Sequence, residues 1–291
     1  MRKPIGSRTF DIVNNCLMVL IAFVTIYPIW YVLIHSLNNG FDSIQGGIYW
    51  WPRRFTTDNY REVFRDATIL RSFGVTILRT VIATIAHVFF TSMTAYAFLN
   101  RETIGRKLYM GMGIITMFFS GGLIPTFILI KNLGLFDSFW VYIFPTMFWF
   151  YDLLIFQAFF RGIPASIEES AKMDGANSFT VFCRIIIPIS GAVFATIALF
   201  NGVFNWNDYF MAIIYTNSQK LHPIQTYLYK LIVASEASKY AMSNAGFDQS
   251  SFTSTSLQMA TMMVTTIPIV CVYPFLQRHF VKGVMLGSVK G

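Results

Sequence analysis

The sequence contains few charged residues. Only 12% of its 291 residues are Asp, Glu, Lys or Arg, while 55% are hydrophobic, and a soluble domain usually carries about 25% charged residues. This shortage argues against a soluble monomer. The charges are mainly basic, with 22 Lys and Arg against 14 Asp and Glu. The basic residues lie in short segments beside apolar runs, a pattern that indicates membrane orientation rather than nucleic-acid binding.

The sequence also lacks the patterns of several chemical sites. Its three cysteines, Cys16, Cys183 and Cys271, form no C-x-x-C pair and lie in or beside apolar segments. We interpret them as small buried side chains rather than as a disulfide framework or a zinc site. The four histidines are scattered without metal-ligand spacing, and no phosphate-binding loop of the form G-x-x-x-x-G-K-[ST] occurs. We therefore expect this chain to bind no metal and no cofactor.

Six apolar stretches are long enough to cross a membrane, since a spanning helix needs about 20 apolar residues. The predicted spans are Val13–Ser36, Thr80–Leu99, Leu108–Ile130, Ser138–Phe160, Pro188–Asn207 and Gln258–Leu276. The sequence thus predicts an all-α, polytopic membrane protein with about six transmembrane helices in a single domain, residues 1–291. A basic start before the first span is typical of a signal peptide, but no small-residue cleavage site follows, and we expect this helix to be retained.

Lysine and arginine predict the orientation of these helices, because cytoplasmic flanks are enriched in basic residues. Such residues precede the first span and follow the second, the fourth and the last, as Arg2, Lys3 and Arg8; Arg101, Arg106 and Lys107; Arg161, Lys172 and Arg184; and Arg278, Lys282 and Lys290. Both termini are therefore expected in the cytoplasm. The loops 38–79 and 208–257 and the turn 131–137 are expected on the outer side.

The segment between the fourth and fifth spans is too polar at its start to cross a membrane. Pro164 punctuates the chain, and Ser166 followed by Glu169 matches a capping box at a helix start. Gly175 suits the left-handed conformation that closes a helix, and Asn177 or Ser178 can cap a second one. The pattern predicts a helix, a sharp corner and a second helix.

This segment has two possible neighbours, a protein groove or the lipid headgroups. Apolar residues share one face of each predicted helix, namely Ile167 with Ala171 and Phe179 with Phe182. An interfacial helix resting on the membrane would show similar faces. However, three acidic residues would then meet an anionic leaflet with only Lys172 nearby, and these are Glu168, Glu169 and Asp174. The charges favour a protein partner.

The same segment resembles the EAA motif of binding-protein-dependent ABC importer permeases. Glu169-Ser170-Ala171 is followed after three residues by Gly175 and after nine more by Ile185-x-Ile187-Pro188. Ser170 stands where the family usually has alanine, and Ile187 replaces the usual leucine. Both substitutions are conservative in size, so the resemblance remains specific.

Other segments resemble the sugar-type members of that family. Asp174-Gly175-Ala176 and the tail 280–291 are similar to the second permease of a maltose-type transporter. Residues 46–60 resemble the subgroup that handles oligo- and polysaccharides, including acidic chains of the pectin or alginate type. Arg53 and Arg54 in this stretch would suit an acidic sugar or would equally hold a binding protein.

The resemblance implies a type I ABC importer permease fold and a coupling helix within the loop 161–187 that inserts into a separate ATPase. The residues assigned to coupling are Glu168, Glu169, Ser170, Ala171, Asp174, Gly175, Ala176, Phe179 and Pro188. The implied partners are a second homologous permease, two ABC ATPase subunits that carry ATP and Mg²⁺, an extracytoplasmic solute-binding protein and membrane lipid. The chain itself would be a non-catalytic subunit in the bacterial inner membrane that imports a carbohydrate.

Polar residues inside or at the end of the spans suggest a substrate path. Asp152 lies within the fourth span, where an aspartate is costly, so it lines that path, bonds to another helix or pairs with Arg161. Near the end of the fifth span, hydrogen-bonding groups alternate with aromatic rings that suit sugars, in the order Asn205, Trp206, Asn207, Asp208 and Tyr209. The alternative for this cluster is a helix-end cap with an aromatic belt.

Two other functions are compatible with a polytopic membrane protein. An ion-coupled secondary transporter would show intramembrane carboxylates and discontinuous helices in repeated halves, and only Asp152 fits. A membrane enzyme acting on lipid-linked sugars would need paired carboxylates or a metal cluster. Glu168 and Glu169 are adjacent and would point about 100° apart on a helix, which makes them a poor acid/base pair.

Overall fold

The computed structural model describes residues 5–100, 103–244 and 255–271. Every secondary-structure element assigned in these ranges is a helix. The β-structure of the described residues is limited to one isolated bridge between Asn38 and Phe55. The all-α prediction is therefore confirmed for the described residues. They group into two compact units, one from residues 5–69, 228–244 and 255–267 and one from residues 70–100, 103–227 and 268–271.

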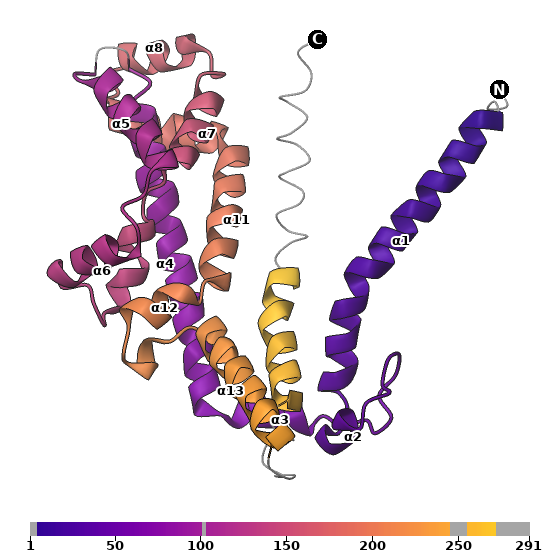
Figure 1. Ribbon diagram of the computed structural model, residues 1–291. Coiled ribbons are helices and arrows are strands. Elements are labelled where there is room, and N and C mark those ends of the chain that lie inside the picture. The colour runs from indigo at the N-terminus through magenta and orange to yellow at the C-terminus, as the bar shows by residue number, and fades with distance from the viewer. Residues whose placement is uncertain (1–4, 101–102, 245–254, 272–291) are drawn as a thin grey trace. The chain divides into compact units, whose positions relative to one another are not determined.

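The first unit begins with a long apolar helix, α1 (Ile5–Ser36), drawn in indigo in Figure 1. Its stretch Phe10–Ser36 has a mean hydropathy of 2.4, and it contains the first predicted span. The short helices α2 (Gly40–Ile44) and α3 (Asp58–Arg65) follow in the loop after it. Later parts of the chain add most of α13 (Ile224–Asn244) and of the helix Thr255–Cys271.

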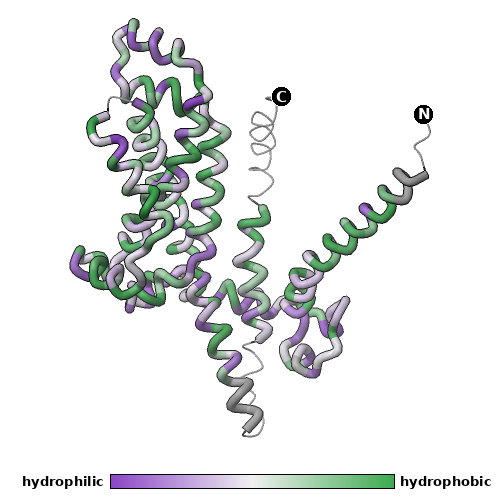
Figure 2. Tube along the Cα trace, turned by 45° about the horizontal axis from the view of Figure 1, so that its top comes forward, coloured by the Kyte–Doolittle hydropathy of each residue, from purple (hydrophilic) through white to green (hydrophobic). Residues whose placement is uncertain are grey.

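The second unit is built around the helices α4 (Ala67–Ala97), α7 (Phe150–Phe160) and α11 (Gly191–Asn207). In Figure 1, α4, drawn in purple, runs beside α7 and α11. Apolar side chains of α7, α11 and the segment after α8 form one core, and those of α4, α6 (Leu123–Asn132), α12 (Phe210–Tyr215) and residues 141–143 form another. Figure 2 shows these helices as mainly hydrophobic.

Three predicted spans are interrupted, which the hydropathy pattern did not predict. Leu108–Ile130 divides into α5 (Arg106–Phe118) and α6. Helix α5 ends where Phe119 takes an extended conformation, and Gly122, with a φ of +85°, directly precedes α6. Ser138–Phe160 consists of η1 (Phe139–Tyr142), η2 (Phe144–Thr146) and α7, with a bend of 49° before α7. Both were predicted as single spans, and the third interruption is the bend of 83° before α11.

The observed bounds of other helices also differ from the predicted ones. Helix α4 starts at Ala67 rather than Thr80, so the predicted loop 38–79 is shorter than expected. Helix α11 starts at Gly191, and Pro188 lies before a bend of 83° that separates it from α11. The last predicted span is observed as Thr255–Cys271, and residues 272–276 lie outside the described part of the chain.

The interpretation of the cysteines as buried was wrong for two of them. Cys16 and Cys271 are exposed, while Cys183 is half-buried. Cys16 lies on α1, where large apolar side chains such as Leu17 and Val19 are also exposed. In a membrane helix such apolar side chains can face lipid, so hydrophobicity does not imply burial inside the protein.

Candidate functional site

The predicted helix, corner and helix are present between the fourth and fifth spans. Helix α8 (Ala165–Met173) ends before Gly175, which has a φ of +83°. Helix α9 (Ser178–Val181) then begins after Asn177, whose side-chain oxygen accepts a hydrogen bond from the Thr180 amide at 2.8 Å. A π-helical turn, η3 (Phe182–Ile186), and the turn α10 (Ile187–Ile189) continue the chain. The exposed Pro188 lies in α10.

The predicted capping box is wrong. Helix α8 begins at Ala165, directly after Pro164, and no side chain caps its start. Ser166 is therefore already inside the helix, and the Ser170 hydroxyl donates to its carbonyl oxygen at 2.8 Å. Because the helix starts one residue before Ser166, Glu168 rather than Glu169 lies in the first turn, where its charge suits the helix dipole.

Glu168 connects α8 to α4. Its carboxylate accepts a hydrogen bond from the Tyr96 hydroxyl at 3.0 Å and pairs with Lys172 at 2.8 Å. The Tyr96 ring also stacks on Phe182, with centroids 5.5 Å apart. Ala171 and Ala176 pack against the adjacent core. The inner side of α8 is thus fixed to the end of a long membrane helix.

The outer side of this segment is polar. The predicted coupling residues that it exposes are Glu169, Ser170, Asp174, Gly175 and Phe179. Figure 2 shows hydrophilic residues gathered in the α8 segment, beside more hydrophobic helices of the same unit. Glu168, Glu169 and Phe179 also line a cavity of about 700 Å³ between the end of α4 and the helices α8 and α9. The cavity offers carboxylates, a cation and an aromatic ring to a neighbour.

The polar cluster after α11 contains a buried ion pair. Arg79 of α4 is completely buried, and its guanidinium pairs with the Asp208 carboxylate and donates to the Asp208 carbonyl oxygen at 3.0 Å. The guanidinium also lies 4.5 Å from the centroid of the Tyr142 ring. The sequence prediction did not include Arg79 in this cluster. Its position in an otherwise apolar stretch was the available signal, because such a cation needs a partner in the membrane.

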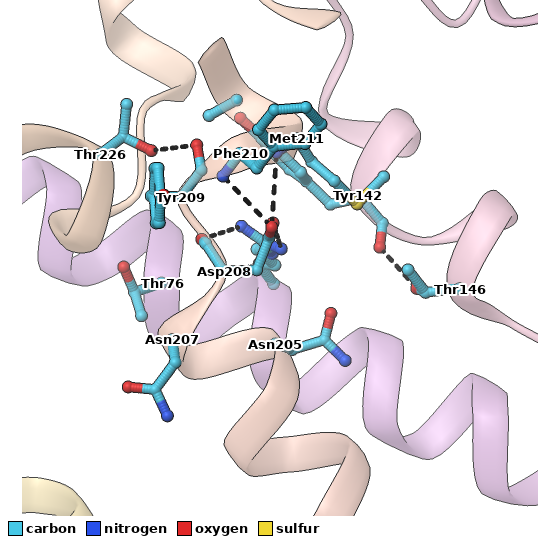
Figure 3. A network of polar contacts seen from close by, with 12 residues as sticks. Thr76, Tyr142, Thr146, Asn205, Asn207, Asp208, Tyr209, Phe210, Met211 and Thr226 are labelled. Carbon is cyan, nitrogen blue, oxygen red and sulfur yellow. Dashed lines mark hydrogen bonds and ion pairs between the residues drawn. The ribbon is translucent and has the colours of Figure 1, made fainter. Parts of the chain in front are cut away.

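The neighbouring residues do not converge on one site. Figure 3 shows Asn205 and Asn207 directed to different sides of α11. Asn205 is buried and donates to Asn201, whereas Asn207 is exposed and donates to the Val203 carbonyl at 2.9 Å. Asp208 also accepts from the amide of Phe210 at 3.2 Å and so acts as a cap for α12. Trp206 is half-buried and Tyr209 exposed.

Asp152 is buried and bonds to another helix. Its carboxylate oxygen lies 2.8 Å from Nε2 of His87 on α4. Arg161, the other partner considered, instead donates to Gln157 at 3.3 Å. Among the described residues, no group of three or more His, Cys, Asp and Glu side chains is arranged to hold a metal ion.

The loop after α1 is organised by Asp42. Arg53 donates to its carboxylate at 3.2 Å and to the Gly46 carbonyl at 2.7 Å, so Arg53 has a structural role in this loop. A hydrogen bond from the Asn38 side chain lowers the pKa of Asp42, and the charges of Arg53 and Arg54 act in the same direction against desolvation. Arg53 and Arg54 are both exposed, although Arg53 is held by Asp42.

Comparison with known proteins relates the chain to bacterial transport systems. The family described as "Binding-protein-dependent transport system inner membrane component" matches residues 93–286. The polygalacturonan/rhamnogalacturonan transport system permease protein YtcP of Bacillus subtilis (strain 168) is 39% identical, and the match covers 98% of this chain and 99% of that protein. Protein LplC of the same organism is 38% identical, with 100% and 98% covered.

A solved structure has a similar fold over almost the whole chain. It is a crystal structure of a bacterial ABC transporter involved in the import of the acidic polysaccharide alginate. One of its chains matches with a TM-score of 0.86 and 29% sequence identity, covering 96% of this chain and 99% of that chain. The similarity therefore extends well beyond the motif around Glu169.

Proposed function

The chain belongs to the family of binding-protein-dependent transport system inner membrane components, and from this we propose that it is a permease subunit of an ATP-driven importer for an acidic oligo- or polysaccharide. The EAA-like motif predicted this family, and one permease relative and one solved neighbour support a role in sugar import. The observation that carries the coupling role is the geometry of α8. Its inner side is tied to α4 through Tyr96 and Glu168, while its outer side is exposed.

This geometry suits the transmission of movement from a cytoplasmic partner. A force on the exposed side of α8 acts on a short helix that begins after Pro164 and ends before Gly175. The Tyr96 hydrogen bond and the ring contact with Phe182 pass that force to α4. Packed helices of this kind switch between discrete arrangements rather than deforming continuously.

The proposed assembly contains a second homologous permease, two ABC ATPase subunits and an extracytoplasmic solute-binding protein. It lies in the bacterial cytoplasmic membrane, with both termini of this chain in the cytoplasm. ATP and Mg²⁺ bind the ATPase subunits, and this chain has no catalytic role. Asp208 and Arg79 form a buried pair at the outer end of α11, while the exposed Asn207 and Tyr209 are the better candidates for contact with substrate.

The proposed substrate is an acidic carbohydrate polymer or its fragments. Two lines of similarity support it, since one relative is a permease for polygalacturonan or rhamnogalacturonan and the solved neighbour imports alginate. Uptake of labelled uronic acid oligosaccharides is therefore expected to exceed uptake of neutral oligosaccharides of the same length. Equal uptake of neutral chains would contradict the acidic class and leave the carbohydrate importer intact.

The coupling role is tested by Gly175→Arg. The variant is expected to insert in the membrane but to lose most ATPase recovery after co-purification in mild detergent, because a long cation would project from the corner beside α8. Gly134→Arg is the matched control, since both glycines have positive φ and no heavy atom within 4 Å of an added Cβ. Loss of the ATPase in both variants, or in neither, would contradict a coupling role for this corner.

The competing function is an ion-coupled secondary transporter. Uptake that continues after ion gradients are collapsed but stops when ATP is removed would exclude it. If the tagged chain is instead recovered without partners and uptake follows an ion gradient, the proposed ATPase and permease partners are wrong and the chain is a secondary transporter.

A further inference from the structure

His87 of α4 contacts both sides of the break in the fourth span. The break lies between η2, which ends at Thr146, and α7, which begins at Phe150. The His87 ring is completely buried, with Nδ1 2.9 Å from the Thr146 carbonyl oxygen and Nε2 2.8 Å from Asp152 Oδ2. Thr146 precedes the break and Asp152 follows it. One side chain of a neighbouring helix thus joins the two halves.

The hydrogen-bond partners determine how the ring is protonated. A carbonyl oxygen can only accept, so Nδ1 must carry a proton and donate it to Thr146. One further proton then lies between Nε2 and the Asp152 carboxylate, on either atom. The pair is neutral overall in both arrangements, which suits its burial inside a membrane protein. This bonding pattern excludes a neutral ring that is protonated on Nε2 alone.

The break itself explains the contact with Thr146. In a continuous α-helix the Thr146 carbonyl would accept the amide hydrogen of Phe150, four residues later, but the chain bends by 49° here. Backbone groups freed within a membrane must find another partner, and His87 supplies it. Asp152 lies in the first turn of α7, where a carboxylate suits the helix dipole.

Aromatic packing closes this junction. The Trp149 ring, at the residue that precedes α7, meets the His87 ring edge to face with centroids 5.2 Å apart. Trp149 also contacts Phe204 of α11, with centroids 4.8 Å apart. The bend is therefore held between α4 and α11 rather than left open.

We propose that His87 is a positioning residue for transport, which fixes the angle between the two halves of the fourth span by bonding to Thr146 and Asp152. The hydrogen-bond network is inferred from the distances and burial alone and does not depend on the proposed function. Its consequence for uptake rests on the proposed transport function, so one test measures each.

The transport test uses four variants of the assembled transporter, with the amount of co-purified complex as the measure of assembly. His87→Leu and Asp152→Leu are expected to lower uptake by at least about tenfold, because each leaves a buried hydrogen-bond partner unsatisfied. Asp152→Asn is expected to retain most uptake, because an asparagine amide can donate to Nε2 of a neutral His87. Thr91→Val, one turn away on α4, is the control, since its buried hydroxyl has no partner among the described residues.

Two results would overturn the positioning role. Either His87→Leu retains normal uptake, or Asp152→Asn fails as completely as Asp152→Leu, which would mean that the charge matters rather than the bonding. If a variant does not assemble, its uptake is not informative, and the hydrogen-bond network is then tested by spectroscopy of the unsubstituted complex. In ¹⁵N NMR of the histidine-labelled complex, the His87 signals, assigned with His87→Gln, are expected to show a protonated Nδ1. An unprotonated Nδ1 would overturn the network, whatever the substrate or energy source of transport.

Discussion

At the scale of single residues, the buried charges determine how the second unit tolerates mutation. The side chains of Arg79 and Asp208 are 0% and 11% exposed, so each depends on the other. A buried ion pair need not stabilise a fold relative to apolar residues, but removal of one partner leaves an uncompensated charge. The difference between a single and a double substitution therefore reports the pairing.

Arg79→Met is expected to cost about 3–5 kcal/mol of stability, because it leaves Asp208 near the core without its cation. The measurement is thermal unfolding of the purified protein in detergent. The double variant Arg79→Met with Asp208→Asn should recover a large part of the loss. If the double variant is no more stable than Arg79→Met alone, the two side chains do not depend on each other.

The residues also show where sequence information was sufficient. Gly175 was predicted in its observed role, and Asn177 was one of the two residues predicted to cap the second helix. A left-handed corner and a helix cap are local requirements that few residue types satisfy. The partners of Asp208 and Asp152 were not predicted. Arg79 and His87 lie far from them in the sequence, and composition alone does not reveal contacts between distant helices.

At the scale of elements, the connection between α8 and α4 determines whether a force on the coupling segment reaches the membrane. Tyr96→Phe keeps the ring that stacks on Phe182 but removes the hydroxyl that donates to Glu168. Uptake is expected to fall by about two- to tenfold, the range of a hydrogen bond to a partly exposed charged group. ATP hydrolysis by the assembled complex should fall less than uptake.

The control for this variant is Tyr109→Phe on α5. Tyr109 is 56% exposed, and no hydrogen bond of its hydroxyl occurs among the described residues. This control removes a phenolic hydroxyl without removing a hydrogen bond between two helices. Equal effects of the two substitutions on the ratio of uptake to hydrolysis would contradict the role of Tyr96.

Two glycines of α5 predict opposite effects of the same substitution. A Cβ atom at Gly113 would lie 1.9 Å from the Phe150 ring of α7, whereas a Cβ at Gly111 would meet no heavy atom within 4 Å. Gly111→Ala should be neutral or stabilise by up to about 1 kcal/mol, because alanine favours a helix. Gly113→Ala should destabilise by about 1–3 kcal/mol through overpacking. The measurement is thermal unfolding of the two purified variants. Equal stability of Gly111→Ala and Gly113→Ala would contradict close packing of α5 on α7.

The interruptions of the predicted spans have a physical reason at this scale. Hydropathy measures whether a stretch prefers lipid, but it does not detect where backbone hydrogen bonds stop. Ser120-Gly121-Gly122 and Pro145 were visible in the sequence. They did not by themselves predict how far each helix is interrupted, because neighbouring helices can satisfy the freed backbone groups of a bent membrane helix. Hydropathy therefore located the apolar stretches but not their continuity.

At the scale of the whole molecule, the distribution of basic residues predicts which side of the membrane each connection occupies. The turn 131–137 is expected outside, while the segment around α8 is expected in the cytoplasm. Only the bent segment from Phe139 to Phe160 separates them. As a helix of about 1.5 Å rise per residue it would reach about 33 Å, slightly more than a hydrocarbon core of about 30 Å. Its length is sufficient to cross, but the bend of 49° also suits a re-entrant segment.

Accessibility of two introduced cysteines separates these arrangements. Cys16, Cys183 and Cys271 are first replaced by alanine, and then Leu133→Cys and Asp174→Cys are made separately at exposed positions. A membrane-impermeant maleimide should label the first in intact spheroplasts and the second only after permeabilisation. Labelling of both from outside would place α8 away from any ATPase and contradict coupling. Protection of both until permeabilisation would instead mean that Phe139–Phe160 enters and leaves on one side, so that the bend held by His87 is the turning point of a re-entrant segment.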